Sequence, residues 1–294
     1  GEDVYVAGVM EHIEEAGIHS GDSSCVLPPY SLPAETVAEI ERQTVALAKE
    51  LRVVGLMNIQ FAVKDGVVFI LEVNPRASRT APFVSKATGV PLPRLATQVM
   101  LGKTLKELDP WSMRRSGYVS VKESVFPFRR FPGVDILLGP EMRSTGEVMG
   151  IAPTFEEAFL KGQWGAGQKL PEGGKVFLSV NDRDKRFVAE VARQYVDLGF
   201  ELLATSGTAG LLAGQGIPST RVLKVYEGRP NIVDLIKNGE VSLVINTASG
   251  KRTAHDSKAI RQATLHYGVP YSTTLSGAKA IARAIGAART TEVR

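Results

Sequence analysis

The stretch VFLSVNDRDKRFVAEVARQYVDLGFELLATSGT, residues 176–208, contains the pattern on which the fold prediction rests. It opens with an apolar run at 176–180 and continues with a helical pattern at 185–198. A second apolar run at 200–204 follows, and a further helix is expected from Thr208. Strands that alternate with helices of this length are typical of a parallel sheet covered by helices on both faces.

The same alternation continues to the end of the chain. Three more apolar runs and three more helical patterns follow in the order expected for βα units. Together the units predict an open, Rossmann-like parallel sheet over residues 175–294. The expected strands are 220–225, 243–245 and 270–274, and the expected helices are 232–237, 256–267 and 277–285.

The first half of the chain has a different, α+β pattern. We expect residues 1–155 to form one domain and the glycine-rich residues 156–174 to form a linker to the α/β domain. Within the first domain the expected elements are strands at 4–9, 56–63 and 68–73, helices at 33–51 and from Pro91, and an irregular stretch at 105–150.

The composition is that of a globular protein and narrows the range of partners. The 294 residues are 44% hydrophobic and 22% charged, with a net charge of +4. Because the basic residues are scattered and aromatic residues do not interleave with them, we expect no nucleic-acid surface, whereas nucleotides suit this balance. The single cysteine, Cys25, excludes an intrachain disulfide, and no apolar run reaches the roughly 18 residues of a membrane span. We therefore expect a cytoplasmic protein with no membrane partner.

Side chains with oxygen donors cluster around an expected hairpin. Glu72 and Asn74 are two residues apart on a strand and therefore leave the same face. Together with Gln60 on the preceding strand, they would offer a carboxylate and two amide oxygens to Mg²⁺ or Mn²⁺ carrying nucleotide phosphates. Arg76 and Arg79 follow the strand, where guanidinium groups can neutralise phosphoryl oxygens. The pattern is equally compatible with a polar strand end that faces solvent.

The turn between the two strands decides whether Gln60 joins the cluster. A strict two-residue turn at Asp65-Gly66 would place Gln60 opposite Leu71 and send Glu72 to the other face. A three-residue or bulged turn would place Gln60 opposite Glu72. The metal-site interpretation therefore requires the longer turn.

A second group of polar residues follows the strands of the expected parallel sheet. The run Thr205-Ser206-Gly207-Thr208 ends a strand and opens a helix, where free backbone N–H groups bind anions. Lys185, Lys224 and Asn246-Thr247 belong to the same carboxyl edge, where ligands of such folds bind. The alternative is that these residues are ordinary helix caps and solvated lysines. The convergence of several of them on one edge favours a phosphate pocket.

Longer runs of sequence resemble a known family. The run Glu72-Val73-Asn74-Pro75-Arg76, after a strand with Gln60-Phe61, is similar to the metal-binding strands of ATP-grasp enzymes. The surrounding sequence resembles the large subunit of carbamoyl-phosphate synthetase over almost the whole chain. The runs that carry this resemblance are 10–14, 19–23, 82–91, 131–135 and 138–148.

The resemblance implies a partial ATP-grasp domain followed by a methylglyoxal-synthase-like allosteric domain. In this family the second of two ATP-grasp units phosphorylates carbamate with ATP, giving carbamoyl phosphate for arginine and pyrimidine biosynthesis. The allosteric domain follows that unit directly. No glycine-rich lid loop precedes Val4, so we expect this chain to hold one side of the ATP clamp and to be catalytically incomplete alone.

The resemblance also implies ligands and partners. The ligands are Mg²⁺ or Mn²⁺, ATP as substrate, and K⁺ as a further cation. The partners are the amino-terminal remainder of the large subunit, a small glutaminase subunit, a nucleoside monophosphate effector and a second copy of the chain.

Individual residues take their roles from matching positions of the family. The metal ligands are Gln60, Glu72 and Asn74, the catalytic arginines are Arg76 and Arg79, and the residues at the nucleotide are His19, Gln60 and Glu72. The residues that would bind the allosteric nucleotide are Ser179, Lys185, Thr205, Thr208, Lys224 and Asn246. Ala248 is a departure, because the family often has a threonine there. The positions that match an ornithine site are Glu14, Asp22, Glu123, Tyr271 and Thr273. The three carboxylates among them are equally compatible with isolated surface acids.

Two other classes of function are alternatives to a synthetase fragment. One is a regulatory module that binds nucleotides without catalysing a reaction. The other is a lyase that forms methylglyoxal from a triose phosphate, which needs a carboxylate base beside the phosphate pocket. Arg229 stands where that aspartate is needed, with Glu227 nearby, so we do not expect lyase activity.

Overall fold

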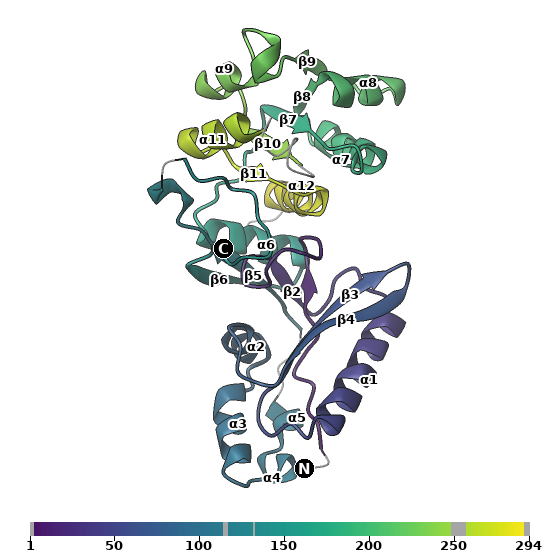
Figure 1. Ribbon diagram of the computed structural model, residues 1–294. Helices are drawn as coiled ribbons and strands as arrows, with labels where there is room; N and C mark the ends of the chain where they lie inside the picture. The colour runs from purple at the N-terminus through teal and green to yellow at the C-terminus, as the bar shows by residue number, and fades with distance from the viewer. Residues whose placement is uncertain (1–2, 114–116, 132, 248–256, 291–294) are drawn as a thin grey trace.

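The computed structural model describes residues 3–113, 117–131, 133–247 and 257–290. Its C-terminal half contains a parallel sheet in the order β11-β10-β7-β8-β9 (Figure 1). The strands are β7 (Lys175–Ser179), β8 (Glu201–Thr205), β9 (Thr220–Val222), β10 (Leu243–Asn246) and β11 (Tyr271–Ser272). Because the sheet grows outward from β7 in both directions, it is doubly wound, and the prediction of an open parallel sheet is confirmed.

Helices cover both faces of this sheet. Val176 and Leu178 belong to one apolar cluster with α7 and α12, whereas Phe177 belongs to a second cluster with α9 and α11. Side chains that alternate along a strand point to opposite faces, which explains the division. The helices are α7 (Lys185–Asp197), α8 (Ser206–Gly214), α9 (Ile232–Lys237), α11 (Lys258–Tyr267) and α12 (Leu275–Thr290).

Several predicted elements differ in length from those observed. The strand predicted at 270–274 covers only Tyr271–Ser272, and the helix predicted at 277–285 extends over Leu275–Thr290. The strand predicted at 220–225 stops at Val222, and a short 3₁₀ helix, η2 (Val225–Glu227), follows it. The helix predicted at 256–267 is α11, although residue 256 lies outside the described ranges.

The first half of the chain is built on an antiparallel sheet in the order β1-β2-β5-β6. Its strands are β1 (Glu11–His12), β2 (Cys25–Leu27), β5 (Val119–Val125) and β6 (Gly146–Ala152). A separate hairpin consists of β3 (Asn58–Lys64) and β4 (Val67–Asn74). The helices are α1 (Ala34–Glu50), α2 (Thr80–Thr88), α3 (Leu92–Met100), α4 (Leu105–Leu108), α5 (Pro110–Met113) and η1 (Phe128–Arg130).

Two predictions for this half are wrong. The strand expected at 4–9 is not a strand, since no described strand pairs with it. The stretch expected to be irregular, 105–150, contains β5 and most of β6. β5 buries the polar residues Ser120, Lys122, Glu123 and Ser124, and this hid the apolar pattern of a strand.

The segment expected to be a linker begins with a buried helix, α6 (Phe155–Gly165), capped by the side chain of Thr154. This helix lies between the two halves and contacts β5, β6 and α12 (Figure 1). It packs closely on β6, because a Cβ added to Gly150 would lie 1.9 Å from the carbonyl oxygen of Ala158. The prediction of a linker over 156–174 did not include this helix, and the domain boundaries remain a prediction.

None of the helices in the described ranges has the length and apolar character needed to cross a membrane.

Candidate functional site

The β3–β4 hairpin closes through a two-residue turn. Lys64 pairs with Val67, and Asp65 and Gly66 have φ angles of 52° and 77°. Positive φ at both central positions is the conformation that favours an Asp-Gly turn, and its twist matches that of the strands. The longer turn that the metal-site interpretation requires is therefore not found in this hairpin.

The extra residue lies in the strand instead of the turn. Phe61 pairs with Ile70 but Gln60 pairs with Glu72, so a bulge leaves Leu71 without a partner across the hairpin. Residues directly opposite each other in an antiparallel pair share one face of the sheet. Gln60 and Glu72 therefore leave the same face, as the metal-site interpretation requires.

Four oxygen-bearing side chains share this face. Nε2 of Gln60 and Nδ2 of Asn74 donate to Oε1 of Glu72 at 2.7 and 2.9 Å. Asn58 pairs across the strands with Asn74 and was missed by the sequence analysis. Its position two residues before Gln60 was the available signal. The side chains of Gln60, Glu72 and Asn74 thus converge within reach of a single cation.

The chemistry of this donor set fits Mg²⁺ or Mn²⁺. Magnesium in nucleotide sites is commonly held by one or two carboxylates together with water and substrate phosphates. The cluster contains a single carboxylate, and nowhere in the described ranges do three or more His, Cys, Asp or Glu side chains form a potential metal cage. An ion held by Glu72 would also attract the amide oxygens of Gln60 and Asn74.

The two predicted arginines lie beyond the end of β4. Nη2 of Arg76 donates to Oδ1 of Asn74 at 3.4 Å, and the guanidinium group of Arg79 contacts the sulfur atom of Met142. Both arginines are exposed. Exposed guanidinium groups beside an oxygen-donor cluster are well suited to phosphate.

The loop that contains His19 lies against the same hairpin. Nε2 of Gln60 donates to Oγ of Ser20 at 3.2 Å. The backbone N–H of His19 donates to the carbonyl of Gly139 at 2.8 Å, and Nδ1 of the His19 side chain accepts from the N–H of Gly21 at 3.0 Å. The structure thus brings His19 close to the donor set, through Ser20, which sequence reasoning had not singled out.

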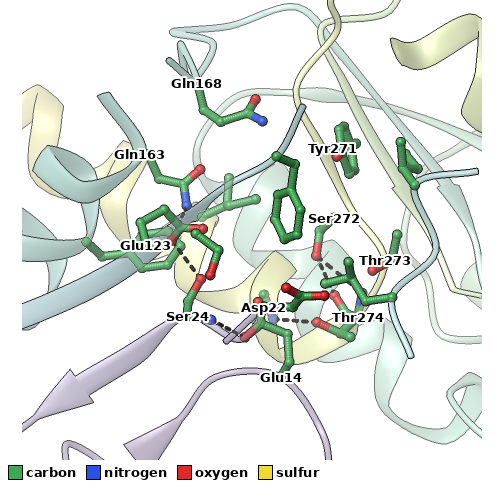
Figure 2. A pocket seen from close by; sticks show the side chains of 17 residues that line it. Glu14, Asp22, Ser24, Glu123, Gln163, Gln168, Tyr271, Ser272, Thr273 and Thr274 are labelled. Carbon is green, nitrogen blue, oxygen red and sulfur yellow. Dashed lines mark hydrogen bonds between the residues drawn. The ribbon is translucent and has the colours of Figure 1, made fainter. Parts of the chain in front are cut away.

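A small cavity of about 80 Å³, lined by both polar and apolar side chains, lies between the two halves of the chain (Figure 2). Asp22 is 1% exposed and Glu123 is 8% exposed, so the alternative of isolated surface acids is wrong for these two. All the residues assigned to an ornithine site line this cavity: Glu14, Asp22, Glu123, Tyr271 and Thr273.

Burial changes the acidity of two carboxyl groups in this cavity, and a neighbouring charge adds to the change at one of them. Desolvation and the charge of Glu123 raise the pKa of Glu14 to about 8. Desolvation also raises the pKa of Glu123, although its Oε2 accepts from Oγ of Ser24 at 2.6 Å and from Nε2 of Gln163 at 2.8 Å. The fully buried Lys122 opposes both shifts through its charge. A bound cation would favour the ionised form of both carboxyl groups.

Asp22 also anchors a neighbouring segment. Its Oδ2 accepts from the backbone N–H of Arg143 at 2.8 Å, and its Oδ1 accepts from that of Ser144 at 2.9 Å. Both carboxylate oxygens therefore hold the backbone at 143–144 in place.

The residues assigned to the effector gather at the carboxyl edge of the parallel sheet. Ser179, Thr205 and Asn246 are the last residues of β7, β8 and β10. Oγ1 of Thr205 donates to Oγ of Ser179 at 3.3 Å, and Nδ2 of Asn246 donates to the carbonyl of Ser179 at 3.2 Å. Thr208, in the first turn of α8, accepts from the N–H of Val180 at 3.4 Å. These residues surround the point where the strand order reverses, where doubly wound folds bind ligands.

Two lysines bring positive charge to the same edge. Nζ of Lys185 lies 2.6 Å from Oδ1 of Asp182 and beside Gly207 at the start of α8. The hydrogen bond and charge of Lys185, together with the charge of Lys224, lower the pKa of Asp182. Both lysines are thus close enough to act on one anionic group. Ala248, the departure from the family's frequent threonine, lies outside the described ranges.

The loop considered for lyase chemistry is engaged in local contacts. Oε2 of Glu227 accepts from the backbone N–H of Lys224 at 2.9 Å, which caps the short helix η2. The guanidinium group of Arg229 pairs with Asp234. Neither contact favours a catalytic base at this loop.

Two protein families match different parts of the chain. Residues 2–108 match the family described as carbamoyl-phosphate synthase L chain, ATP binding domain. Residues 187–273 match the family described as MGS-like domain. The fold prediction, a partial ATP-grasp domain followed by a methylglyoxal-synthase-like domain, agrees with both matches.

Curated relatives match nearly the whole chain. The carbamoyl phosphate synthase large chain of Mesorhizobium japonicum is 55% identical over 98% of this chain and 25% of its own length. The same protein of Pasteurella multocida is 57% identical over 97% of this chain and 27% of its own length. The chain therefore spans about a quarter of the length of these relatives. A solved biotin carboxylase domain of a thermophilic 2-oxoglutarate carboxylase gives a TM-score of 0.37 at 15% identity, covering 50% of this chain and 44% of that one.

Proposed function

We propose, from the premise that this chain is a homologue of one quarter of the carbamoyl phosphate synthase large chain, that it supplies one side of an ATP site and the domain that regulates it. The complete protein would phosphorylate carbamate with ATP to give carbamoyl phosphate and ADP. The observation that carries the proposal is the bulged register of the β3–β4 hairpin, because it turns Gln60 toward Glu72.

The donor set defines what this chain would contribute to the reaction. Glu72, Gln60 and Asn74 would hold Mg²⁺ or Mn²⁺, which neutralises the phosphates of ATP when bound. Arg76 and Arg79 would bind the oxygens of the transferring phosphoryl group and stabilise the charge on them. A carbamate oxygen attacks the terminal phosphorus of ATP, and the bond from that phosphorus to the bridging oxygen breaks as ADP leaves.

The hairpin also supports a partner for this chain. Val67 and Phe69, which leave the same face of β4, are 54% and 49% exposed, an apolar surface that suits contact with another protein segment. The amino-terminal remainder of the large subunit would cover it and complete the ATP clamp. We further propose a small glutaminase subunit, a homo-oligomer, K⁺ as an additional cation, a cytoplasmic location, and roles in arginine and pyrimidine biosynthesis.

Two regulatory ligands fit the remaining sites. A nucleoside monophosphate, such as UMP or IMP, would place its phosphate among Ser179, Thr205, Thr208 and Lys185, with Lys224 and Asn246 at the rim. Ornithine, a cation with a carboxylate, would occupy the acidic cavity between the two halves. If the chain acts alone, these sites favour the second candidate, a binding module without catalysis.

The proposal is tested by Glu72→Gln in the full-length large chain with its partner subunit. We expect ATP-dependent carbamoyl phosphate synthesis to fall at least about a hundredfold, since the only carboxylate of the donor set is lost. Glu50→Gln, an exposed position at the end of α1, is the matched control and should leave the rate unchanged. A rate for Glu72→Gln within twofold of that of the wild type would contradict the assignment of this site.

A further inference from the structure

One ion pair joins the two halves of the chain beside the effector pocket. Arg261, on α11, is 1% exposed. Its Nε and Nη2 donate to Oδ1 and Oδ2 of Asp135, each at 2.6 Å. Two parallel hydrogen bonds between a guanidinium group and a carboxylate fix both position and angle, which a lysine could not do.

The same guanidinium group reaches the wall of the effector pocket. Nη1 of Arg261 donates to Oδ1 of Asn246 at 3.3 Å, while the amide nitrogen of Asn246 donates to the backbone carbonyl of Ser179. Burial works against the ionised form of Asp135, but the hydrogen bonds and charge of Arg261 hold its pKa below the usual value. Arg261 therefore contacts a predicted effector residue on one side and an ionised carboxylate of the first half on the other.

Asp135 begins a segment, residues 135–144, that extends to the ATP site. Nη1 of Arg143 donates to the backbone carbonyl of Asp135 at 2.9 Å, which ties the two ends of the segment together. Between them, the carbonyl of Gly139 accepts from the N–H of His19. The sulfur atom of Met142 contacts Arg79.

Further hydrogen bonds hold the segment near both of its ends. The carboxylate of Asp22 accepts from two consecutive backbone N–H groups, those of Arg143 and Ser144. A second residue of α11, Gln262, donates to the carbonyl of Gly133 at 3.1 Å, just before the segment. Movement of α11 would therefore move one end of the segment. The other contacts of the segment are with His19 and Arg79.

We propose that Arg261 and Asp135 are positioning residues through which an occupied nucleotide pocket changes the placement of His19 and Arg79. A bound nucleotide competes for the side chain of Asn246 and so alters one contact of Arg261. Asp135 follows the guanidinium group because both of its oxygens are held. A ligand shifts a conformational equilibrium only if it contacts the two states differently, and the contact between Asn246 and Arg261 supplies that difference. This inference rests on the proposed function of both sites.

A second ion pair across the same interface provides a matched control. Nε of Arg283, on α12, donates to Oε1 of Glu156, on α6, at 2.8 Å. Neither residue contacts the effector residues or the 135–144 segment in any described interaction. If loosening the interface in general were enough to disturb regulation, removing this pair would have the same effect as removing the pair of Arg261 and Asp135.

The experiment uses the assembled full-length synthase with the variants Asp135→Asn, Arg261→Lys, the double variant and Glu156→Gln. Calorimetry gives the Kd for UMP and for IMP, and steady-state kinetics give the KM for ATP with and without saturating nucleotide. For Asp135→Asn we expect a Kd within about threefold of the wild type, but a nucleotide effect on the KM for ATP at least fivefold smaller. The double variant should lose no more of this effect than either single variant, since all remove the same contact. Glu156→Gln should retain the full effect.

The outcomes separate the inference from the function on which it rests. If Asp135→Asn and Arg261→Lys bind nucleotide and keep its full effect on the KM for ATP, the link is refuted. An equal loss in Glu156→Gln would also refute it, because the interface as a whole would then be responsible. No binding of UMP or IMP by the wild type would instead contradict the proposed regulatory function. Arg261→Lys covers the case in which Asp135→Asn fails to fold, as judged by its melting temperature.

Discussion

Glu14 shows how burial and a like charge act together on one carboxyl group. Its pKa rises from 4.5 to about 8, first because the group is desolvated and then because Glu123 is close. Its Oε2 still accepts from the N–H of Ser24 at 2.6 Å. Near neutral pH the group therefore remains largely protonated until a cation or a higher pH ionises it.

This shift predicts a specific pH dependence of stability. A raised pKa in the folded state gives a stabilising contribution that is complete below 4.5 and is lost as the pH rises through about 8. Between pH 6.5 and 8.5 the free energy of unfolding of the wild type should therefore fall by roughly 2 kcal/mol more than that of Glu14→Gln, because the variant lacks the carboxyl group. Urea unfolding at the two pH values measures it.

Neighbouring residues determine the pH range of this experiment and supply its control variant. His12 has its pKa lowered to about 4 by burial and by Lys122, so its own contribution changes between pH 6.5 and 4, below the window. The exposed Glu15→Gln is the control and should keep the pH dependence of the wild type. An equal slope in Glu14→Gln and the wild type would show that Glu14 is ionised throughout.

Residue types and spacing were enough to name part of the candidate site. Glu72 and Asn74 could be predicted because a period of two on a strand places them on one face. Whether Gln60 joins them could not, because a bulge at Leu71 is decided by packing of the whole hairpin and has no signal in the turn residues. Asn58 lay on the same face but was overlooked.

At the scale of elements, strand β6 and helix α6 approach unusually closely. A Cβ on Gly150 would lie 1.9 Å from the carbonyl oxygen of Ala158 and 2.6 Å from the nitrogen of Gly162. Both are backbone atoms of α6, so neither can rotate away as a side chain could. The contact depends on the absence of a side chain at this position.

Gly150→Ala should therefore lower the free energy of unfolding by about 1–3 kcal/mol through overpacking. Gly146→Ala, on the same strand, is the matched control, because its Cβ would have no atom within 4 Å. Urea denaturation of both variants makes the comparison. Equal stability of the two variants would mean that β6 and α6 are not in close contact.

The two halves differ in how well their elements could be predicted, for a physical reason. Strands such as β7 are buried on both faces and therefore read as continuous apolar runs. β5 is just as deeply buried, but its Lys122, Glu123 and Ser124 are stabilised by partners distant in sequence. Composition alone cannot reveal such partners. It also did not reveal α6, because the glycines after this helix are typical of a linker and its buried face depends on packing.

At the scale of the whole molecule, one apolar cluster extends across both halves. It includes Val26 and Val121 of the first sheet, Phe155 and Phe159 of α6, and Ile281 of α12. Residues of both halves therefore lose contacts together when the chain unfolds.

We expect a single thermal transition for this chain. Phe159→Ala, at a residue 2% exposed, should cost about 3–5 kcal/mol and lower the temperature of that one transition. Phe131→Ala, at a residue 55% exposed, should leave it nearly unchanged. Differential scanning calorimetry measures the number of transitions. Two separate peaks, only one of which shifts in Phe159→Ala, would contradict a shared core.

The helix that replaces the first part of the expected linker has a consequence for module exchange. A chimaera joined at the glycines after residue 165 would take α12 from one parent and α6 from the other, although the two helices pack together. Such a junction divides a matched pair of surfaces, so grafted regulatory domains should fold poorly unless α6 and the β6 surface under it come from the same parent. The unit that can be transplanted between relatives is thus larger than the region matched as MGS-like.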